Sequence, residues 1–263
     1  MKRTSHPVQA VLSTVRGASL LAFGLVALAR LAPASAEEQS LAPPASSPVV
    51  LDSQFGKLTL GGYGEGYYQW NFNRPPSGIT NFRGFDNRHN AFTIANAVVD
   101  AQYEKSGVMA RIALQVGHTP NTYYLAEPSS PGAGGAGSTD ASTWKYIQQA
   151  YASAKAPVGK GLTFQLGIFL SPIGMEGMAV KDNWNWSRSN LFFGLPFYHT
   201  GMRASYGLTD ALTLSVAGYN GWNSVVDNND EKSVSAALDY VVTDRVTFHA
   251  LYFGGVERAP PAR

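Results

Sequence analysis

The sequence predicts an all-β protein, a transmembrane antiparallel up-and-down β-barrel with about nine visible strands. Apolar and polar residues alternate along several segments of roughly 9–11 residues, the length that a tilted strand needs to cross a bilayer. Short turns and long loops alternate between these segments, as they do in membrane barrels, which have short turns at one end and long loops at the other. Charged residues make up only 14% of the chain and aromatic residues 12%, whereas a soluble protein typically carries about 25% charged residues.

The stretch 161–222 shows the pattern most clearly. Two alternating segments, Met202–Leu208 and Ala211–Tyr219, flank the turn Thr209-Asp210. A third segment, Leu162–Leu170, is followed by a long loop rich in Gly, Trp, Asn and Phe. Successive side chains of a strand point to opposite faces, so alternation gives each strand one apolar and one polar face. These segments therefore predict membrane hairpins.

The first strand is expected from about Leu58 to Phe72. Residues of one parity are apolar or glycine and residues of the other are mostly polar, which predicts an outer and an inner face. The Gly-rich run GGYGEG in this strand resembles a phosphate loop, but such a loop has to open a helix. Here it continues as Tyr-Tyr-Gln-Trp, a strand, so nucleotide binding is excluded.

The remaining segments follow the same rule. In the second strand, Ala95, Ala97, Val99, Ala101 and Tyr103 are expected to face lipid. The other strands are expected at about 92–103, 108–116, 144–156, 233–242 and 245–253, with tight turns at 104–107, 157–160, 209–210 and 243–244 and long loops at 73–90, 118–143, 171–199 and 223–232. An ordinary soluble β-sheet protein with aromatic cross-strand pairs is the alternative, but the turn and loop asymmetry favours the barrel.

The N-terminus is predicted to be a cleavable signal peptide, residues 1–36. Lys2, Arg3 and Arg16 supply positive charge, residues 17–29 an apolar run, and Ala34-Ser35-Ala36 a small-residue cleavage site. A short membrane anchor is the alternative. Residues 37–56 are then expected to be a flexible Pro- and Ser-rich segment, residues 57–255 the barrel, and residues 256–263 a terminal tail.

Composition excludes several classes of function. The net charge is +2 without a cluster of basic residues, so nucleic-acid binding is not expected. The chain has no cysteine, which removes disulfides and cysteine-based metal sites. The five histidines share no ligand spacing, so we expect no metal and no cofactor. The acidic run 227–231 lacks the Gly and distal Glu of an EF-hand and is expected to be a solvated loop.

Four motifs, S-P-I-G-M-E, W-S-R-S-N, H-T-G and N-G-W-N followed by D-N-N, occur in the segments 150–177, 183–193, 196–214 and 220–234. Over residues 57–255 the chain resembles the OmpL-like β-barrel porins. The resemblance implies a barrel in the bacterial outer membrane that is surrounded by outer-membrane lipids and passes small hydrophilic solutes or ions. It leaves homo-oligomerisation, for example as a trimer, open.

The chain departs from that family in length. Bacterial barrels close with an even number of strands, whereas about nine are visible here and the chain ends in Ala-Pro-Pro-Ala-Arg without a terminal aromatic strand. We therefore expect a C-terminally truncated, incomplete barrel, because an open sheet in lipid leaves unpaired edges. Direct pairing of the first with the ninth strand would be parallel.

Inward-facing charges are the candidate functional residues, because charges at a constriction determine ion selectivity. Strand parity gives Glu65, Asp100, Arg111, Lys145, Lys155, Arg203 and Asp239, and the loop 171–199, which in porin-like barrels often folds inward, gives Glu176, Lys181, Asp182 and Arg188. Glu176 and Arg188 lie in the most specific motifs and are therefore the leading candidates for residues at the constriction. Salt bridges that merely hold the loop are the alternative. Both signs occur, so a preference for anions or cations stays open.

Catalysis is not expected. The sequence has no G-x-S-x-G or H-E-x-x-H motif. Two other classes stay open: an outer-membrane barrel enzyme or adhesin that acts through the long loops, with Ser187 or Ser189 near His199, and a soluble periplasmic β-sheet module.

Overall fold

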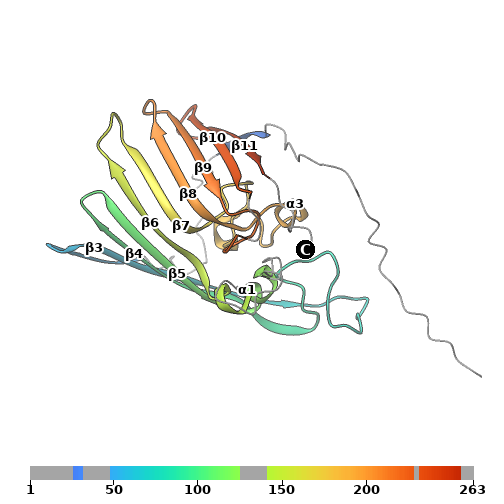
Figure 1. The fold of residues 1–263 in the computed structure, drawn as a ribbon. Helices are drawn as coiled ribbons and strands as arrows, with labels where there is room; N and C mark the ends of the chain where they lie inside the picture. The colour runs from blue at the N-terminus through green and yellow to red at the C-terminus, as the bar shows by residue number, and fades with distance from the viewer. Residues whose placement is uncertain (1–25, 32–47, 125–140, 228–230, 256–263) are drawn as a thin grey trace, which may run out of the picture.

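The computed structural model describes residues 26–31, 48–124, 141–227 and 231–255. They form one antiparallel sheet with the strand order β1-β11-β10-β9-β8-β7-β6-β5-β4-β3-β2. The sheet curves around a concave face (Figure 1). Its edge strands β2 and β1 are not paired with each other, so the sheet is open within the described residues. The predicted all-β antiparallel fold is confirmed.

The strands are β1 (Val26–Leu31), β2 (Val49–Ser53), β3 (Gly56–Gln69), β4 (Ala91–Lys105), β5 (Val108–Val116), β6 (Ile147–Ala156), β7 (Leu162–Leu170), β8 (Tyr198–Gly207), β9 (Leu212–Tyr219), β10 (Ser233–Val241) and β11 (Val246–Gly254). The short helices α1 (His118–Tyr123), α2 (Ala141–Trp144), η2 (Val180–Asp182) and α3 (Asn190–Phe193) lie in the loops. No described helix is long and apolar enough to span a membrane. The nine predicted segments correspond to β3 through β11.

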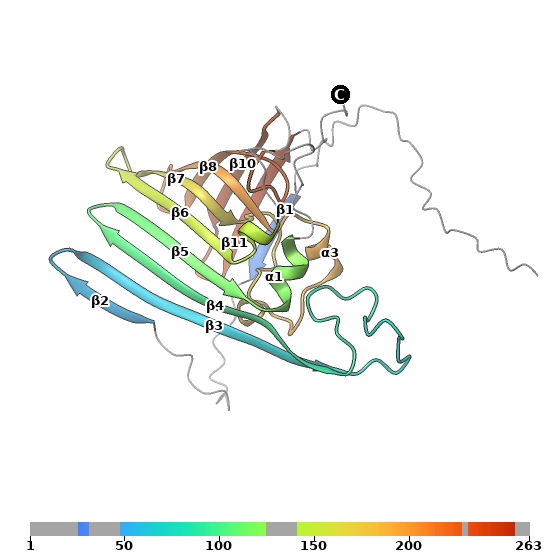
Figure 2. The ribbon, with the colours of Figure 1, turned by 60° about the horizontal axis from the view of Figure 1, so that its bottom comes forward.

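From β2 to β11 each strand pairs with its neighbours in sequence, which is the up-and-down connectivity. The connections after β2, β4, β6, β8 and β10 are tight turns, and those after β3, β5, β7 and β9 are long loops. Because the chain reverses at every connection, all tight turns lie at one rim of the sheet and all long loops at the other (Figure 2).

Two strands were not expected. Residues 49–53, part of the segment predicted to be flexible, form β2 and pair with β3 through a hairpin in which Gly56 has a φ of 130°. The run Val-Val-Leu supplies strand propensity, and glycine allows the positive φ. β1 lies within the predicted signal peptide and pairs with β11. Residues 1–25 and 32–36 of that peptide, like the tail 256–263, lie outside the described residues.

The outward face is apolar and the concave face polar. On β7 the side chain of Leu166 points outward and the residue is 64% exposed, whereas its neighbour Gln165 is 7% exposed. Val99, Ile112 and Val216 are likewise exposed on their strands. A row of large apolar side chains on the outer surface would be costly in water and is the arrangement that hydrocarbon stabilises.

One predicted side-chain direction is wrong. Ala95, expected to face lipid, is 4% exposed. Glu65 pairs with Asn96 and Gly66 with Ile94, so Ala95 is the extra residue of a β-bulge in β4. A bulge reverses the parity on either side of it. The outward residues are therefore Phe92 and Ile94 before the bulge, and Ala97 and Val99 after it.

Aromatic side chains pack at the long-loop rim. One cluster joins four loops and strand ends through Phe85, Tyr124, Ile168, Met178, Phe192, Tyr198 and Val225. A second cluster packs Phe169 against Tyr219, Leu251 and Phe253 on the strands. Ile168 has the parity of Leu166 but is 6% exposed, because it is part of the first cluster. The loops thus form a packed structure at this rim.

Candidate functional site

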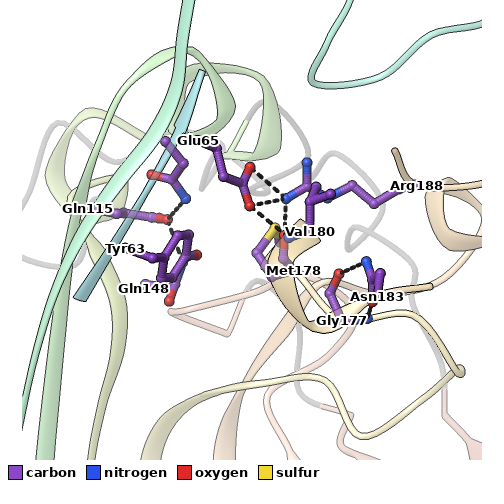
Figure 3. A network of polar contacts seen from close by, with 10 residues as sticks. Tyr63, Glu65, Gln115, Gln148, Gly177, Met178, Val180, Asn183 and Arg188 are labelled. Carbon is purple, nitrogen blue, oxygen red and sulfur yellow. Dashed lines mark hydrogen bonds and ion pairs between the residues drawn. The ribbon is translucent and has the colours of Figure 1, made fainter. Parts of the chain in front are cut away.

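The loop between β7 and β8, residues 171–197, reaches the concave face. The backbone N–H of Val180, the first residue of η2, donates to Glu65 Oε1 at 2.7 Å. Glu65 belongs to β3, 115 residues before Val180 in the sequence. Its side chain points into the concavity, toward the loop (Figure 3). The loop therefore folds inward, toward the wall formed by β3.

Arg188 makes the second connection between the loop and this wall. Its Nη2 lies 3.0 Å from both carboxylate oxygens of Glu65 and also donates to the carbonyl oxygen of Met178 (Figure 3). The guanidinium group lies 5.2 Å from the ring centroid of Phe85. The two side chains are 4% and 11% exposed. The pair is buried, and removing one partner of such a pair costs about 3–5 kcal/mol because the other charge stays in a low dielectric.

Glu176 has a different role from Arg188. Its Oε2 accepts from the backbone N–H and the hydroxyl of Ser189, at 2.8 and 2.9 Å. Ser189 in turn caps α3 by accepting from the N–H of Phe192. Asn183 bonds to both backbone polar groups of Gly177. These contacts fix the shape of the loop. Of the two leading candidates, Arg188 is the one whose side chain binds the strand wall, through Glu65 (Figure 3).

Two further ion pairs lie near this loop. Arg111 on β5 bonds to both carboxylate oxygens of Asp100 on β4, with Nε at 3.0 and 3.1 Å. Lys181 Nζ lies 2.6 Å from Asp182 Oδ1 and 5.7 Å from the ring centroid of Tyr63. The Lys181 and Asp182 side chains are about half exposed, so that pair is weak, whereas the bidentate geometry of Arg111 makes the first pair strong.

The other charges predicted from strand parity lie apart from the loop. Arg203 on β8 bonds to Gln165 and lies over the ring of Phe169. Asp239 on β10 accepts from the ring Nδ1 of His249 at 2.6 Å, and Lys155 is exposed near the tight-turn rim.

The prediction placed Lys145 on a strand, and this is wrong. The predicted strand begins at residue 144, whereas β6 begins at Ile147, because residues 141–144 form α2 and Lys145 follows in a turn. Its Nζ donates to Asn121 in α1 at 3.2 Å and lies over the ring of Tyr146. Lys145 therefore belongs to the long-loop rim.

Sequence reasoning missed a buried amide network on the concave face. Gln148 Nε2 donates to Tyr63 Oη at 3.0 Å and to Gln115 Oε1 at 3.2 Å (Figure 3). Gln115 Oε1 also accepts from Asn96 at 3.3 Å. All three amides are at most 3% exposed. The signal was the pair Gln148-Gln149, which lies at a second bulge opposite Ala113 and Leu114, but amides were not considered alongside the charges.

A cavity of about 750 Å³ lies between the loop and the wall formed by β2 to β7. The polar residues that line it are Tyr63, Asp100, Arg111, Gln148, Gln149, Lys181 and Asp182. The cavity thus brings four of the predicted charges together with the amide network. No group of three His, Asp or Glu side chains in the described ranges is placed to hold a metal ion.

His199 does not pair with Ser187 or Ser189, which the enzyme alternative requires. Its Nδ1 faces the carbonyl oxygen of Gly221 at 3.0 Å and is therefore the N–H donor, while Nε2 faces Ser171 Oγ at 3.1 Å. The ring is fully buried and stacks on Tyr219. These contacts tie the end of β7 to β8 and β9, which is a structural role.

Comparison with known proteins agrees with this arrangement. The family described as "Putative beta-barrel porin-2, OmpL-like" matches residues 57–263. Neither a curated protein nor a solved structure matches the chain significantly.

Proposed function

Because the chain belongs to the OmpL-like β-barrel porin-2 family, which implies an outer-membrane location, we propose that it forms a water-filled channel for the passive diffusion of small hydrophilic solutes or ions. The outer face contacts outer-membrane lipids, and the concave face lines the water-filled lumen. Export is through the predicted signal peptide, cleaved after Ala36. The channel performs no covalent chemistry.

The observation that carries this proposal is the contact of the long loop with Glu65. A loop that folds onto the inner wall of a barrel reduces the cross-section available to a solute, and the polar groups that remain determine what passes. Here two charge-assisted contacts, from Arg188 and Val180, hold the loop on β3. Glu65 and Arg188 thus set the width of the channel, and Glu176 shapes the loop.

The remaining charges act on the solute. Asp100, Arg111, Lys181 and Asp182 line the cavity beside the loop. Lys155, Arg203 and Asp239 contribute to the field toward the tight-turn rim. The concave face carries negative charges on β3, β4 and β10 and positive charges on β5, β6 and β8. Because both signs are present in similar number, the channel has weak selectivity between anions and cations.

Ion conductance through planar lipid bilayers tests this proposal. The full chain, folded and inserted, should give discrete conductance steps in potassium chloride and a small reversal potential in a salt gradient. Protein that is demonstrably folded and inserted but gives no steps would contradict the proposal. Hydrolysis of an ester or peptide panel would instead favour a barrel enzyme, and recovery from the soluble periplasmic fraction a soluble module.

A further inference from the structure

The cavity beside the loop is large enough for a small organic solute. Its volume of about 750 Å³ falls within the range of about 300–1,000 Å³ of small-molecule sites. Lys181 and Asp182 of η2 line it, and the backbone N–H of Val180, the first residue of η2, donates to Glu65. A solute that passes the loop on this side therefore enters the cavity.

The charges at the cavity neutralise one another. Arg111 forms three hydrogen bonds with the carboxylate of Asp100, and Lys181 lies beside Asp182. Each pair has a net charge of zero, so neither a cation nor an anion meets an uncompensated partner. A charged solute that enters gives up part of its hydration and finds no strong counter-ion in return, because Arg111 is already bound to Asp100 and the exposed Lys181 and Asp182 interact only weakly.

The neutral polar groups at the cavity are both donors and acceptors. Gln149 is 6% exposed, lines the cavity, and its amide makes no hydrogen bond with any residue that the structure describes. Tyr63 accepts from Gln148, so its own O–H proton is available to a solute. Gln148 is held by two hydrogen bonds, which keeps this part of the wall preorganised. Hydroxyl groups are the solute chemistry that needs donors and acceptors together.

We propose that this cavity is a binding subsite for neutral, polyhydroxylated solutes of mono- to disaccharide size. Gln149 and Tyr63 bind solute hydroxyl groups, and the two ion pairs make the cavity bind charged analogues less tightly than neutral ones. The proposal rests on the channel function proposed above, because solutes reach the cavity through the lumen.

The test is block of the ion current by sugars of equal size and different charge. Glucose, gluconate and glucosamine are added to channels of the full chain in planar bilayers, and the concentration that halves the current is measured for each. Glucose should block at a concentration several-fold below the other two. Gln149→Leu should raise the half-blocking concentration of glucose by about two- to tenfold, as expected for the loss of one neutral hydrogen bond.

Gln102→Leu is the matched control. Gln102 faces the same concave side from β4, opposite Arg111 in the register, but does not line the cavity, so this variant should leave glucose block unchanged. Equal block by all three sugars, or equal effects of the two substitutions, would overturn the subsite while leaving the channel intact. Absence of any conductance from the folded, inserted chain would instead refute the channel itself, and the subsite with it.

Discussion

Releasing the loop from β3 should widen the channel. Glu65→Ala removes the carboxylate that accepts from Val180 and Arg188 and leaves the Arg188 side chain, 4% exposed, without its counter-ion. The loss is about 3–5 kcal/mol. This loss weakens the attachment of the loop to β3 and not the sheet itself, because the strands keep their hydrogen bonds. At 1.4 kcal/mol per factor of ten, the equilibrium between attached and released loop shifts by about 10²- to 10³-fold or more toward release.

Single-channel recording measures this shift directly. Wild-type channels should give one steady conductance, and Glu65→Ala channels a larger and noisier one. Asp182→Asn is the control for loop release: it removes a charge from the same loop, but the pair of Asp182 with Lys181 is exposed and worth at most about 1 kcal/mol, so this variant should change the size of the current without the added noise of a released loop. Exchange of the pair, Glu65→Arg with Arg188→Glu, should recover part of the wild-type conductance. Unchanged conductance in a folded Glu65→Ala protein would refute the role assigned to this pair.

Three further predictions concern stability. Leu166→Lys places a charge on the outer face and should destabilise the protein in vesicles by about 2–4 kcal/mol if it lies at bilayer depth, whereas Ser205→Lys on the concave face should cost much less; equal losses in denaturant unfolding would contradict the assigned faces. Ala95→Leu overfills the buried bulge and should cost about 1–3 kcal/mol in the same assay; a neutral effect would show that the bulge is loosely packed. Burial and the nearby Arg88 lower the pKa of His118 in the folded protein. The unfolded chain therefore binds the proton more readily, and the free energy of unfolding should fall as the pH drops below about 6.5. His118→Gln should weaken this pH dependence, and an unaltered pH profile would exclude His118 as its source.

Alternation along single strands predicts most of this fold. β7 alternates strictly from Leu162 to Leu166, and the structure places these side chains as the parity requires. The rule fails at Ala95, because a bulge depends on how β4 pairs with β3 and has no signature in β4 alone. β2 was missed because its neighbours in the sequence are rich in Pro and Ser, which favoured a flexible segment.

The site was harder to predict than the fold. Glu65 and Arg188 were both candidates, but they are 123 residues apart in sequence, and no local pattern indicates that they meet. Lys145 was placed on a strand because the polar and apolar residues around Trp144 happen to alternate, although the chain forms α2 and a turn there. The amides at Gln115 and Gln148 were overlooked since only charged residues were considered for the lumen.

Side-chain accessibility in the bilayer tests the central claim, that the concave face is wet and the outer face is in lipid. The chain has no cysteine, so single substitutions report one position each. Leu166→Cys and Val99→Cys, carrying a fluorophore, should be quenched by brominated lipid tails and protected from a charged water-soluble thiol reagent. Gln165→Cys and Asp100→Cys should show the reverse. Labelling of Leu166→Cys by the aqueous reagent together with quenching of Gln165→Cys by lipid would contradict the account.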